Sequence, residues 1–348
     1  MNTGRIIRVL IAEDSSTSRL LLGEILRSDG RFEVVGEAVN GLEAVDKTGL
    51  LKPDVILMDI HMPGIDGVKA TRRIMESFPV PIVIVTGSAL FNDVSITLEA
   101  LNAGALAVLR KPSGPGSPGF LEESIRIVST IKAMAGLKLV RRKPRQEEKR
   151  IEELEKPEIT PRPVRILVVG ASTGGPAVLR QILSSLPASF PVPILVVQHI
   201  SDGFTAGFAE WLGDSSSLIV KIAEDGELLV PGTVYIAPER RHLGVYNSRI
   251  SISKAPPVGG FQPSVSYMFE SVVAGFGSEV LAIIASGMGD DGVEGLRRIK
   301  ERGGLVWAQD ENSCAVFGMP ARSIEAGLVN AVLSPDEMVA GALKVVGI

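Results

Sequence analysis

The sequence predicts an α/β fold class, with two doubly wound parallel-sheet domains joined by a charged linker. Apolar runs of strand length alternate with helical patterns in both halves of the chain, which is typical of parallel sheets covered by helices on both faces. The 348 residues suffice for about two domains of roughly 100 to 200 residues each. We place the first domain at residues 1–126, the linker at 127–162 and the second domain at 163–348.

The composition is that of an ordinary globular protein, with 45% hydrophobic and 22% charged residues. A net charge of −4 gives no electrostatic reason to expect a nucleic acid or an anionic membrane as a partner. The single cysteine, Cys314, excludes an internal disulfide and a cysteine-rich metal site. Because no apolar run approaches about 20 residues and the first residues lack a signal-peptide pattern, we expect a cytoplasmic protein without direct membrane insertion.

A stretch of mixed charge separates the two halves. From Lys138 to Glu158 the chain reads KLVRRKPRQEEKRIEELEKPE, with basic residues first and acidic residues after them. It has no consistent apolar face, which favours a solvated helix or a flexible tether. Pro157, Pro161 and Pro163 then end any helix before the second domain begins.

In the first domain, five apolar runs predict strands, and helical stretches near Ser18–Ser28 and Gly41–Thr48 lie between them. The predicted strands cover residues 8–14, 32–38, 54–60, 81–88 and 106–112. Chemically active groups gather beyond the carboxyl ends of parallel strands. The sequence therefore predicts a functional site at that edge of the first sheet.

Polar residues of the kind needed for phosphoryl transfer stand at these strand ends: Glu13, Asp14, Asp59, Thr86 and Lys111. Carboxylates from two strand ends favour a hard divalent cation with oxygen ligands, most plausibly Mg²⁺. Asp59 can then accept a phosphoryl group, while Lys111 offsets the charge on its oxygens and Thr86 hydrogen-bonds one of them.

The first domain resembles a response-regulator receiver domain. The matching segments are AEDSS at 12–16, LMDIHMPGIDG at 57–67, TGS at 86–88 and RKP at 110–112. The resemblance implies a five-stranded, flavodoxin-like domain that a histidine kinase phosphorylates on Asp59, with Glu13 and Asp14 helping to hold Mg²⁺. One departure is Val108, because family members usually carry Phe or Tyr there and that aromatic ring takes part in relaying the signal.

In the second domain, a glycine-rich turn follows the first apolar strand. Residues 170–175 read GASTGG, which places Ser172 in a G-x-S-x-G spacing at a strand-to-helix turn. Such a turn exposes a serine hydroxyl near the unpaired N–H groups of the following helix. Ser172 is therefore a candidate nucleophile, although a glycine-rich turn also binds dinucleotides or phosphate.

Two further strand ends supply the partners that an activated serine needs. PILVVQH ends in His199, and VLAIIASGMGDDG ends in a turn that carries Asp290 and Asp291. If the sheet is parallel, hydroxyl, imidazole and carboxylate meet at one rim, as general-base activation of serine requires. A dinucleotide site would need an acid after the second strand, and this chain has none there. A P-loop would need a lysine after the glycines, which is also missing. The order Ser, His, Asp along the chain differs from the Ser, Asp, His order of α/β-hydrolases.

From Ile166 onward the chain resembles the catalytic domain of chemotaxis protein-glutamate methylesterases of the CheB type. The matching segments are GASTGG at 170–175, QH at 198–199, GFT at 203–205, AEDGE at 223–227, YIAP at 235–238, PSV at 263–265, SGMGDDG at 286–292 and CAVFGMP at 314–320. The resemblance implies a Rossmann-like domain with Ser172 as nucleophile, His199 as base and Asp291 as orienting acid. The backbone N–H of Thr173 suits an oxyanion hole, and the resemblance suggests that of Met288 as the second donor.

What this resemblance implies is phosphorylation-regulated hydrolysis of glutamate γ-methyl esters on a chemoreceptor, with release of methanol and without a cofactor in the catalytic domain. Deamidation of receptor glutamines would use the same residues, and a histidine kinase of the CheA type would be the phosphodonor. Two alternatives stay open: a phosphorylation-controlled binding module with an inactive hydrolase domain, and a nucleotide-binding regulator.

Several residues carry expectations that the structure can check. Relatives commonly read RPSVD where this chain has Gln262 and Ser266 at the flanks, and the missing arginine and acid could order the active-site rim. We expect Cys314 to be a buried, inert thiol, Trp211 and Trp307 to be core residues, and His242 to lie on an exposed turn. We also expect the unphosphorylated first domain to cover the rim that carries Ser172 and His199.

Overall fold

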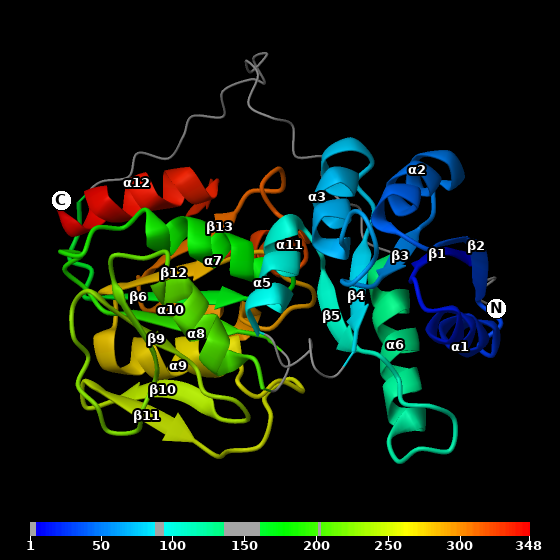
Figure 1. Cartoon of the computed structure of the whole chain (residues 1–348). Helices are drawn as coiled ribbons and strands as arrows, with labels where there is room; N and C mark the ends of the chain where they lie inside the picture. The colour runs from blue at the N-terminus through cyan, green and yellow to red at the C-terminus, as the bar shows by residue number, and fades with distance from the viewer. Residues whose placement is uncertain (1–4, 88–93, 136–160, 201–202) are drawn as a thin grey trace. The chain divides into compact units, whose positions relative to one another are not determined.

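The computed structural model describes residues 5–87, 94–135, 161–200 and 203–348 (Figure 1). The chain divides into two compact units, Met1–Lys143 and Pro144–Ile348. Each unit has its own parallel sheet with helices on both faces, which confirms the predicted fold class.

The first unit contains a five-stranded sheet in the order β2-β1-β3-β4-β5, and each pair of neighbours is parallel. Its strands are β1 (Ile7–Ala12), β2 (Phe32–Ala38), β3 (Val55–Met58), β4 (Ile82–Thr86) and β5 (Ala107–Arg110). Strands β3 and β4 are buried along their whole length, as continuous apolar runs in a doubly covered sheet should be. The chain winds in opposite directions from β1 and β3, so ligands are expected beyond the carboxyl ends of these two strands.

The helices of the first unit lie on both faces of this sheet: α1 (Ser16–Arg27), α2 (Gly41–Leu51), α3 (Gly67–Ser77), α5 (Val94–Ala103) and α6 (Phe120–Ala135). Helices α1 and α6 contact each other on one face, and α3 contacts both α2 and α5 on the other. Ser15, Asn40 and Asp66 cap the first three helices by accepting hydrogen bonds from backbone N–H groups of the first turn.

Helix α6 extends further than the predicted first domain. Residues 127–135, which form the start of the predicted linker, are helical here, and their apolar residues Ile127, Ile131 and Met134 are buried. Spacings of four and three residues put these side chains on one helix face. The rest of the charged stretch, residues 136–160, lies outside the described residues, so the linker and the domain limits stay predictions.

The second unit contains a seven-stranded sheet in the order β14-β13-β12-β6-β7-β9-β8, again with parallel neighbours throughout. Its strands are β6 (Ile166–Ala171), β7 (Ile194–Gln198), β8 (Ile219–Ile222), β9 (Thr233–Ile236), β12 (Val280–Ile284), β13 (Leu305–Gln309) and β14 (Ala331–Leu333). An antiparallel hairpin, β10 (His242–Tyr246) with β11 (Arg249–Ser253), contacts the helix that follows it. The sequence pattern did not predict this hairpin.

The helices of the second unit are α7 (Gly175–Ser184), α8 (Thr205–Gly213), α9 (Val265–Phe276), α10 (Val293–Glu301), α11 (Met319–Glu325) and α12 (Pro335–Val346). Helix α7 contacts α8 and α12, and α10 contacts α9 and α11. Trp307 is buried on β13, and Trp211 packs on Phe208 with the Arg180 guanidinium over its ring, so both tryptophans are core residues as predicted.

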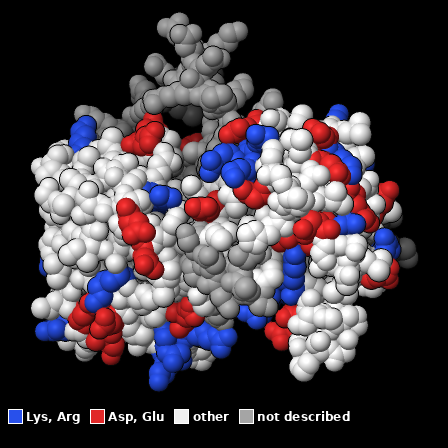
Figure 2. All heavy atoms as spheres, in the orientation of Figure 1, with Lys and Arg blue, Asp and Glu red and all other residues white. Residues whose placement is uncertain are grey.

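Charged residues on the visible faces of the units are intermixed in sign (Figure 2). Many form short-range pairs, such as Lys221 with Glu224 and Glu227. Exposed pairs of this kind add little to stability, about 0–1 kcal/mol each. The fold therefore depends on its buried sheets rather than on its surface charges.

Gly67 is required where the segment after β3 meets the start of α3. A Cβ on Gly67 would lie 1.9 Å from the Asp59 carbonyl oxygen, so the two backbones touch. We expect Gly67→Ala to destabilise the first unit by about 1–3 kcal/mol, since a buried backbone must move to admit the methyl group.

Denaturant unfolding of the full chain, followed by far-UV circular dichroism and by tryptophan fluorescence, measures this effect. Both tryptophans belong to the second unit, so the transition that leaves tryptophan fluorescence unchanged is that of the first unit. Gly114→Ala is the matched control, because Gly114 has open space around it and an ordinary φ. Equal midpoints for the two variants would contradict the argument.

Candidate functional site

Three neighbouring strands of the second sheet bring the predicted catalytic residues to one edge. Strand β6 lies between β7 and β12. Ser172 directly follows β6, His199 directly follows β7, and Asp291 lies in the loop between β12 and α10. Because the three strands are parallel, these residues share the carboxyl edge of the sheet, as predicted from the sequence.

His199 and Asp291 are in direct contact. The Nε2 atom of His199 lies 2.9 Å from Oδ2 of Asp291, and the Asp291 side chain is buried. A carboxylate can only accept a hydrogen bond, so Nε2 carries the proton and Nδ1 is left as the basic nitrogen. Nδ1 is buried and has no hydrogen-bond partner in the described part of the chain. Asp290 is exposed, which supports the preference for Asp291.

Asp291 is held at the N-terminus of α9. Oδ1 accepts hydrogen bonds from the Ser264 hydroxyl at 2.9 Å and from the Ser266 N–H at 3.0 Å, and Oδ2 accepts one from the Val265 N–H at 2.8 Å. Burial works to raise the pKa of Asp291, but the hydrogen bonds from His199 and from these backbone N–H groups outweigh it and lower the pKa. Asp291 is therefore an anion fixed in orientation, as a residue that orients a histidine must be.

Ser172 lies at the turn between β6 and α7. Its N–H donates to the Ser286 carbonyl at 3.0 Å, and its carbonyl accepts from the Gly175 N–H at 2.8 Å. Gly174 adopts a positive φ of 80°, and a Cβ there would lie 2.6 Å from the Ser286 hydroxyl, so the turn needs glycine. No hydrogen bond links the Ser172 hydroxyl to His199 within the described residues, so their catalytic pairing is a proposal.

Gln198 ties the nucleophile to the base. Its amide nitrogen donates to the Ser172 carbonyl at 2.7 Å and to the His199 carbonyl at 2.9 Å. The side chain is buried, and a Cβ on Gly175 would lie 2.1 Å from its oxygen. Gln198 therefore fixes the spacing between the two strand ends.

The predicted oxyanion donors lie on the two loops that meet beside Ser172. The Thr173 carbonyl accepts a hydrogen bond of 2.8 Å from the Ser286 hydroxyl, which fixes the peptide after the nucleophile. The segment before Met288 approaches closely, since a Cβ on Gly287 would lie 2.8 Å from the Ser172 Cβ. Met288 itself is 41% exposed. Backbone N–H groups of Thr173 and Met288 remain the proposed oxyanion hole.

The two departures near the PSV segment have structural roles. Ser266 is buried, and its hydroxyl accepts a hydrogen bond of 2.8 Å from the Gly292 N–H, beside Asp291. Gln262 donates to the Ala255 carbonyl at 2.6 Å. Between them and His199, Phe261 stacks on the imidazole with ring centroids 4.4 Å apart and planes 5° apart. Neutral side chains, rather than an arginine and an acid, therefore order this part of the active-site rim.

Sequence reasoning missed several residues that build this site. Ser264 had a usable signal, because serine at a helix start is a preferred N-cap and Ser264 caps α9. Gln198 also had a signal, because the QH segment at 198–199 is one of the matching segments. Phe261 gave none, since its role depends on a contact across the fold. The expectation that His242 lies on an exposed turn is wrong: its side chain is fully buried. Cys314 is a buried free thiol whose pKa burial raises, as expected of an inert cysteine.

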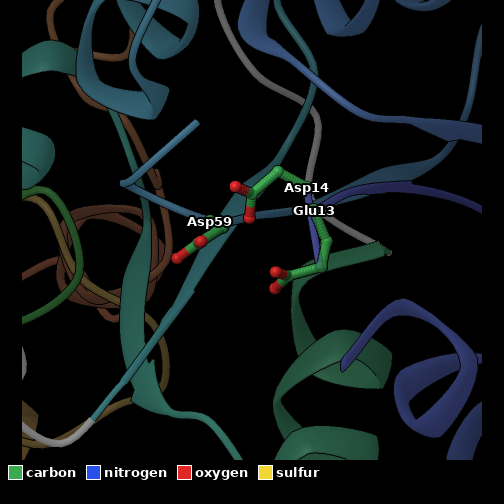
Figure 3. Close-up of side chains that lie close together, drawn as sticks. All are labelled: Glu13, Asp14 and Asp59. Atoms are coloured by element: carbon green, nitrogen blue, oxygen red, sulfur yellow. The ribbon is translucent and has the colours of Figure 1, made fainter. Parts of the chain in front are cut away.

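In the first unit, the three predicted metal ligands gather beyond the ends of β1 and β3 (Figure 3). One carboxylate oxygen each of Glu13, Asp14 and Asp59 lies within 4.8 Å of the others. Glu13 and Asp59 are buried, and Asp14 is exposed. The Ile60 N–H donates to Asp59 Oδ1 at 2.8 Å and so holds the proposed phosphoryl acceptor in place.

Lys111 closes the same pocket. Its ammonium lies 2.8 Å from Glu13 and 2.9 Å from Asp59. Burial works against the charged ammonium, but hydrogen bonds to these two carboxylates outweigh it and raise the pKa of Lys111. The Thr86 hydroxyl is buried and has no hydrogen-bond partner among the described residues, so it is free to bind a phosphoryl oxygen.

The pocket suits a hard divalent cation. Burial raises the pKa of Glu13 and of Asp59, so the pocket disfavours bare negative charge and is stabilised by added positive charge. Three carboxylates offer the oxygen ligands that Mg²⁺ prefers. Val108, in contrast, is buried in the apolar core of the unit and provides no ring that could change rotamer between states.

These two sites define a class of protein: a two-unit α/β chain with an acidic cluster at the carboxyl edge of one sheet and a His–Asp pair beside a serine at the carboxyl edge of the other. The comparisons with known proteins agree with this class. Residues 9–117 match the response regulator receiver domain model, and residues 167–341 match the CheB methylesterase model. The chain belongs to the CheB methylesterase family.

Relatives match over almost the whole chain. A "protein-glutamate methylesterase/protein-glutamine glutaminase 4" of Myxococcus xanthus is 49% identical over 95% of this chain and 94% of its own length. The corresponding protein 3 of Anaeromyxobacter dehalogenans is 50% identical over 95% and 96%. The crystal structure of the Thermotoga maritima CheB methylesterase catalytic domain is 40% identical, has a TM-score of 0.51, and covers 52% of this chain and 98% of its own.

Helices that could cross a membrane are not found: none in the described part of the chain combines sufficient length with sufficient hydropathy.

Proposed function

We propose that this protein hydrolyses γ-methyl esters of glutamate residues on a chemoreceptor, releasing methanol, and that phosphorylation of Asp59 controls the reaction. The contact of 2.9 Å between His199 and a buried, pKa-lowered Asp291 carries the catalytic part of the proposal. The relatives match 95% of the chain, and their names support the choice of substrate.

In the proposed reaction, Nδ1 of His199 removes the proton from the Ser172 hydroxyl as its oxygen attacks the ester carbonyl. Asp291 stabilises the imidazolium that forms, because its carboxylate already accepts a hydrogen bond from the Nε2–H group. The N–H groups of Thr173 and Met288 bind the oxyanion. His199 then gives its proton to the oxygen of the departing methoxy group, so that methanol leaves and the acyl group stays bound to Ser172. A water molecule next gives a proton to His199 as its oxygen attacks the acyl carbon, and His199 returns that proton to the Ser172 oxygen as the glutamate carboxylate is released.

Deamidation of receptor glutamines uses the same three residues. Ammonia is a poorer leaving group than methanol, so the reaction depends more strongly on proton donation by His199. A protein with both activities would supply its own methylation sites, since each deamidated glutamine becomes a glutamate.

Asp59 is the proposed phosphoryl acceptor, and a histidine kinase of the CheA type the proposed donor. Glu13, Asp14 and Asp59 would hold Mg²⁺, which would supply positive charge to offset that of the transferring phosphoryl group. The Lys111 ammonium pairs with a phosphoryl oxygen, and the Thr86 hydroxyl, which has no partner among the described residues, donates a hydrogen bond to another. Chemoreceptor and kinase act together in the cytoplasm, and we place this protein there.

Methanol release from a methylated chemoreceptor fragment tests the proposal. We expect the full chain to release methanol faster when a small phosphodonor and Mg²⁺ are present. Asp59→Asn should abolish this acceleration, because an amide cannot accept the phosphoryl group. Removal of Mg²⁺ with a chelator should have the same effect, since without the cation the three carboxylates repel the negatively charged phosphoryl group.

Asp54→Asn serves as a matched control, because Asp54 is an acid of the same unit that pairs with Arg5 and lies outside the phosphoryl pocket. It should respond to the donor as the unchanged protein does. If the rate of methanol release were the same with and without the phosphodonor in every variant and in the unchanged protein, control by Asp59 would be contradicted. No release from several receptors would instead favour a phosphorylation-controlled binding module.

A further inference from the structure

His242 connects the hairpin of the second unit to the active-site loop. It begins β10, its side chain is 0% exposed, and its ring stacks on Tyr267 of α9 with centroids 4.4 Å apart. A histidine so deeply buried is held by specific hydrogen bonds or it destabilises the fold.

Both ring nitrogens of His242 bond to the backbone. Nε2 lies 3.1 Å from the Pro256 carbonyl, which can only accept, so Nε2 carries a proton. Nδ1 accepts a hydrogen bond of 3.2 Å from the Ser264 N–H. The imidazole is therefore neutral, with one nitrogen as donor and the other as acceptor.

These two bonds close a loop that contacts the catalytic pair. Pro256 and Ser264 are the two ends of the segment 256–264, and His242 joins them. Within the segment, Phe261 stacks on the imidazole of His199. At its end, the Ser264 hydroxyl donates to Asp291 at 2.9 Å. The buried side chain of His242 thus fixes Phe261, whose ring packs on His199, and Ser264, whose hydroxyl holds Asp291.

We propose that His242 is a positioning residue of the hydrolase site, which orients His199 and Asp291 through the segment 256–264 without touching substrate. The acceptor nitrogen Nδ1 matters most. It binds the Ser264 N–H, and Ser264 is the first residue of the segment whose Ser266 N–H holds Asp291. The proposal deepens the proposed function and rests on Ser172 being the nucleophile.

Two variants distinguish the role of the Nδ1 atom of His242 from that of its Nε2 atom. In His242→Asn, the side-chain oxygen can occupy the place of Nδ1 and accept from Ser264. In His242→Gln, the amide nitrogen can occupy the place of Nε2 and donate to Pro256, which leaves the Ser264 N–H without an acceptor. Both variants lose the ring that stacks on Tyr267, so that loss cancels in the comparison.

The primary readout is the rate at which a fluorophosphonate modifies Ser172 in the full chain, because this reaction needs the nucleophile and base but no receptor. We expect His242→Gln to react about 10-fold or more slowly than the unchanged protein, since a buried N–H loses its partner. His242→Asn should stay within about 3-fold of the unchanged protein, because that bond is kept. With a methylated receptor fragment, the loss in His242→Gln should fall on kcat and leave KM unchanged.

Equal labelling rates in the two variants, or an unchanged rate in His242→Gln, would overturn the proposal. If neither variant folds, Phe261→Leu tests the same segment from a half-buried position and should slow labelling about 2- to 10-fold by removing the stacked ring. An unchanged rate there also overturns it. Rapid Ser172 labelling without methanol release from any receptor would refute the proposed function and leave this inference standing.

Discussion

Ser172→Ala is expected to lower methanol release by about 10⁵- to 10⁶-fold in kcat, the loss seen when a serine nucleophile is removed from a working triad. The hydroxyl is the only proposed group that bonds to the acyl carbon, so no neighbour can replace it. The rate is measured on the full chain with a methylated receptor fragment, phosphodonor and Mg²⁺.

The first unit provides an internal control for this variant. Phosphorylation of Asp59 by a small phosphodonor should proceed as in the unchanged protein, which shows that the first unit is folded. An unchanged tryptophan emission spectrum shows the same for the second unit, which contains Trp211 and Trp307. Thr173→Ala should retain most activity, because only its backbone N–H is assigned a role. Substantial methanol release from Ser172→Ala would remove Ser172 from the mechanism.

Asp291→Asn is expected to lower kcat by about 10⁴-fold, as for other triads in which the orienting acid becomes an amide. The new side-chain amide could present an N–H to His199 and so reverse the tautomer, leaving Nδ1 protonated and unable to accept from Ser172. The neighbouring Asp290→Asn is the matched control, because Asp290 is exposed and the same charge is lost. Equal losses in both variants would contradict the assignment of Asp291.

The stability of Asp291→Asn should also depend on pH. The folded protein lowers the pKa of Asp291, so its carboxylate stabilises the fold above the unfolded pKa. That stabilisation is lost as the pH falls through the lowered folded pKa. Denaturant unfolding should therefore show the variant as less stable than the unchanged protein at neutral pH, and the difference should shrink in acid.

The chemistry-bearing residues could be predicted because each one lies at or beyond the carboxyl end of a buried strand. A run such as ILVVGA fixes where β6 stops, and a parallel sheet then brings Ser172, His199 and Asp291 to one edge whatever their separation in sequence. The same logic placed Glu13 and Asp59 together in the first unit. Periodicity and strand order carry this information without any knowledge of packing.

The groups that hold these residues in place could not be predicted in this way. His242 follows two arginines, which suggested a polar turn, yet the hairpin it begins folds against α9 and buries it. Phe261 looked like an ordinary apolar residue, and its contact with His199 joins positions 62 residues apart. Both depend on contacts between distant segments. Helix α6, in contrast, passed the predicted domain limit because its apolar face continues through Ile127, Ile131 and Met134.

The division of the chain into two compact units has an optical consequence. Residues 1–143 contain neither tryptophan nor tyrosine, and both tryptophans, Trp211 and Trp307, belong to the second unit. Tryptophan fluorescence of this protein therefore comes entirely from the unit that Asp59 does not belong to. A change in emission when a phosphodonor is added would report, without any label, that the chemical event at Asp59 has reached the hydrolase unit.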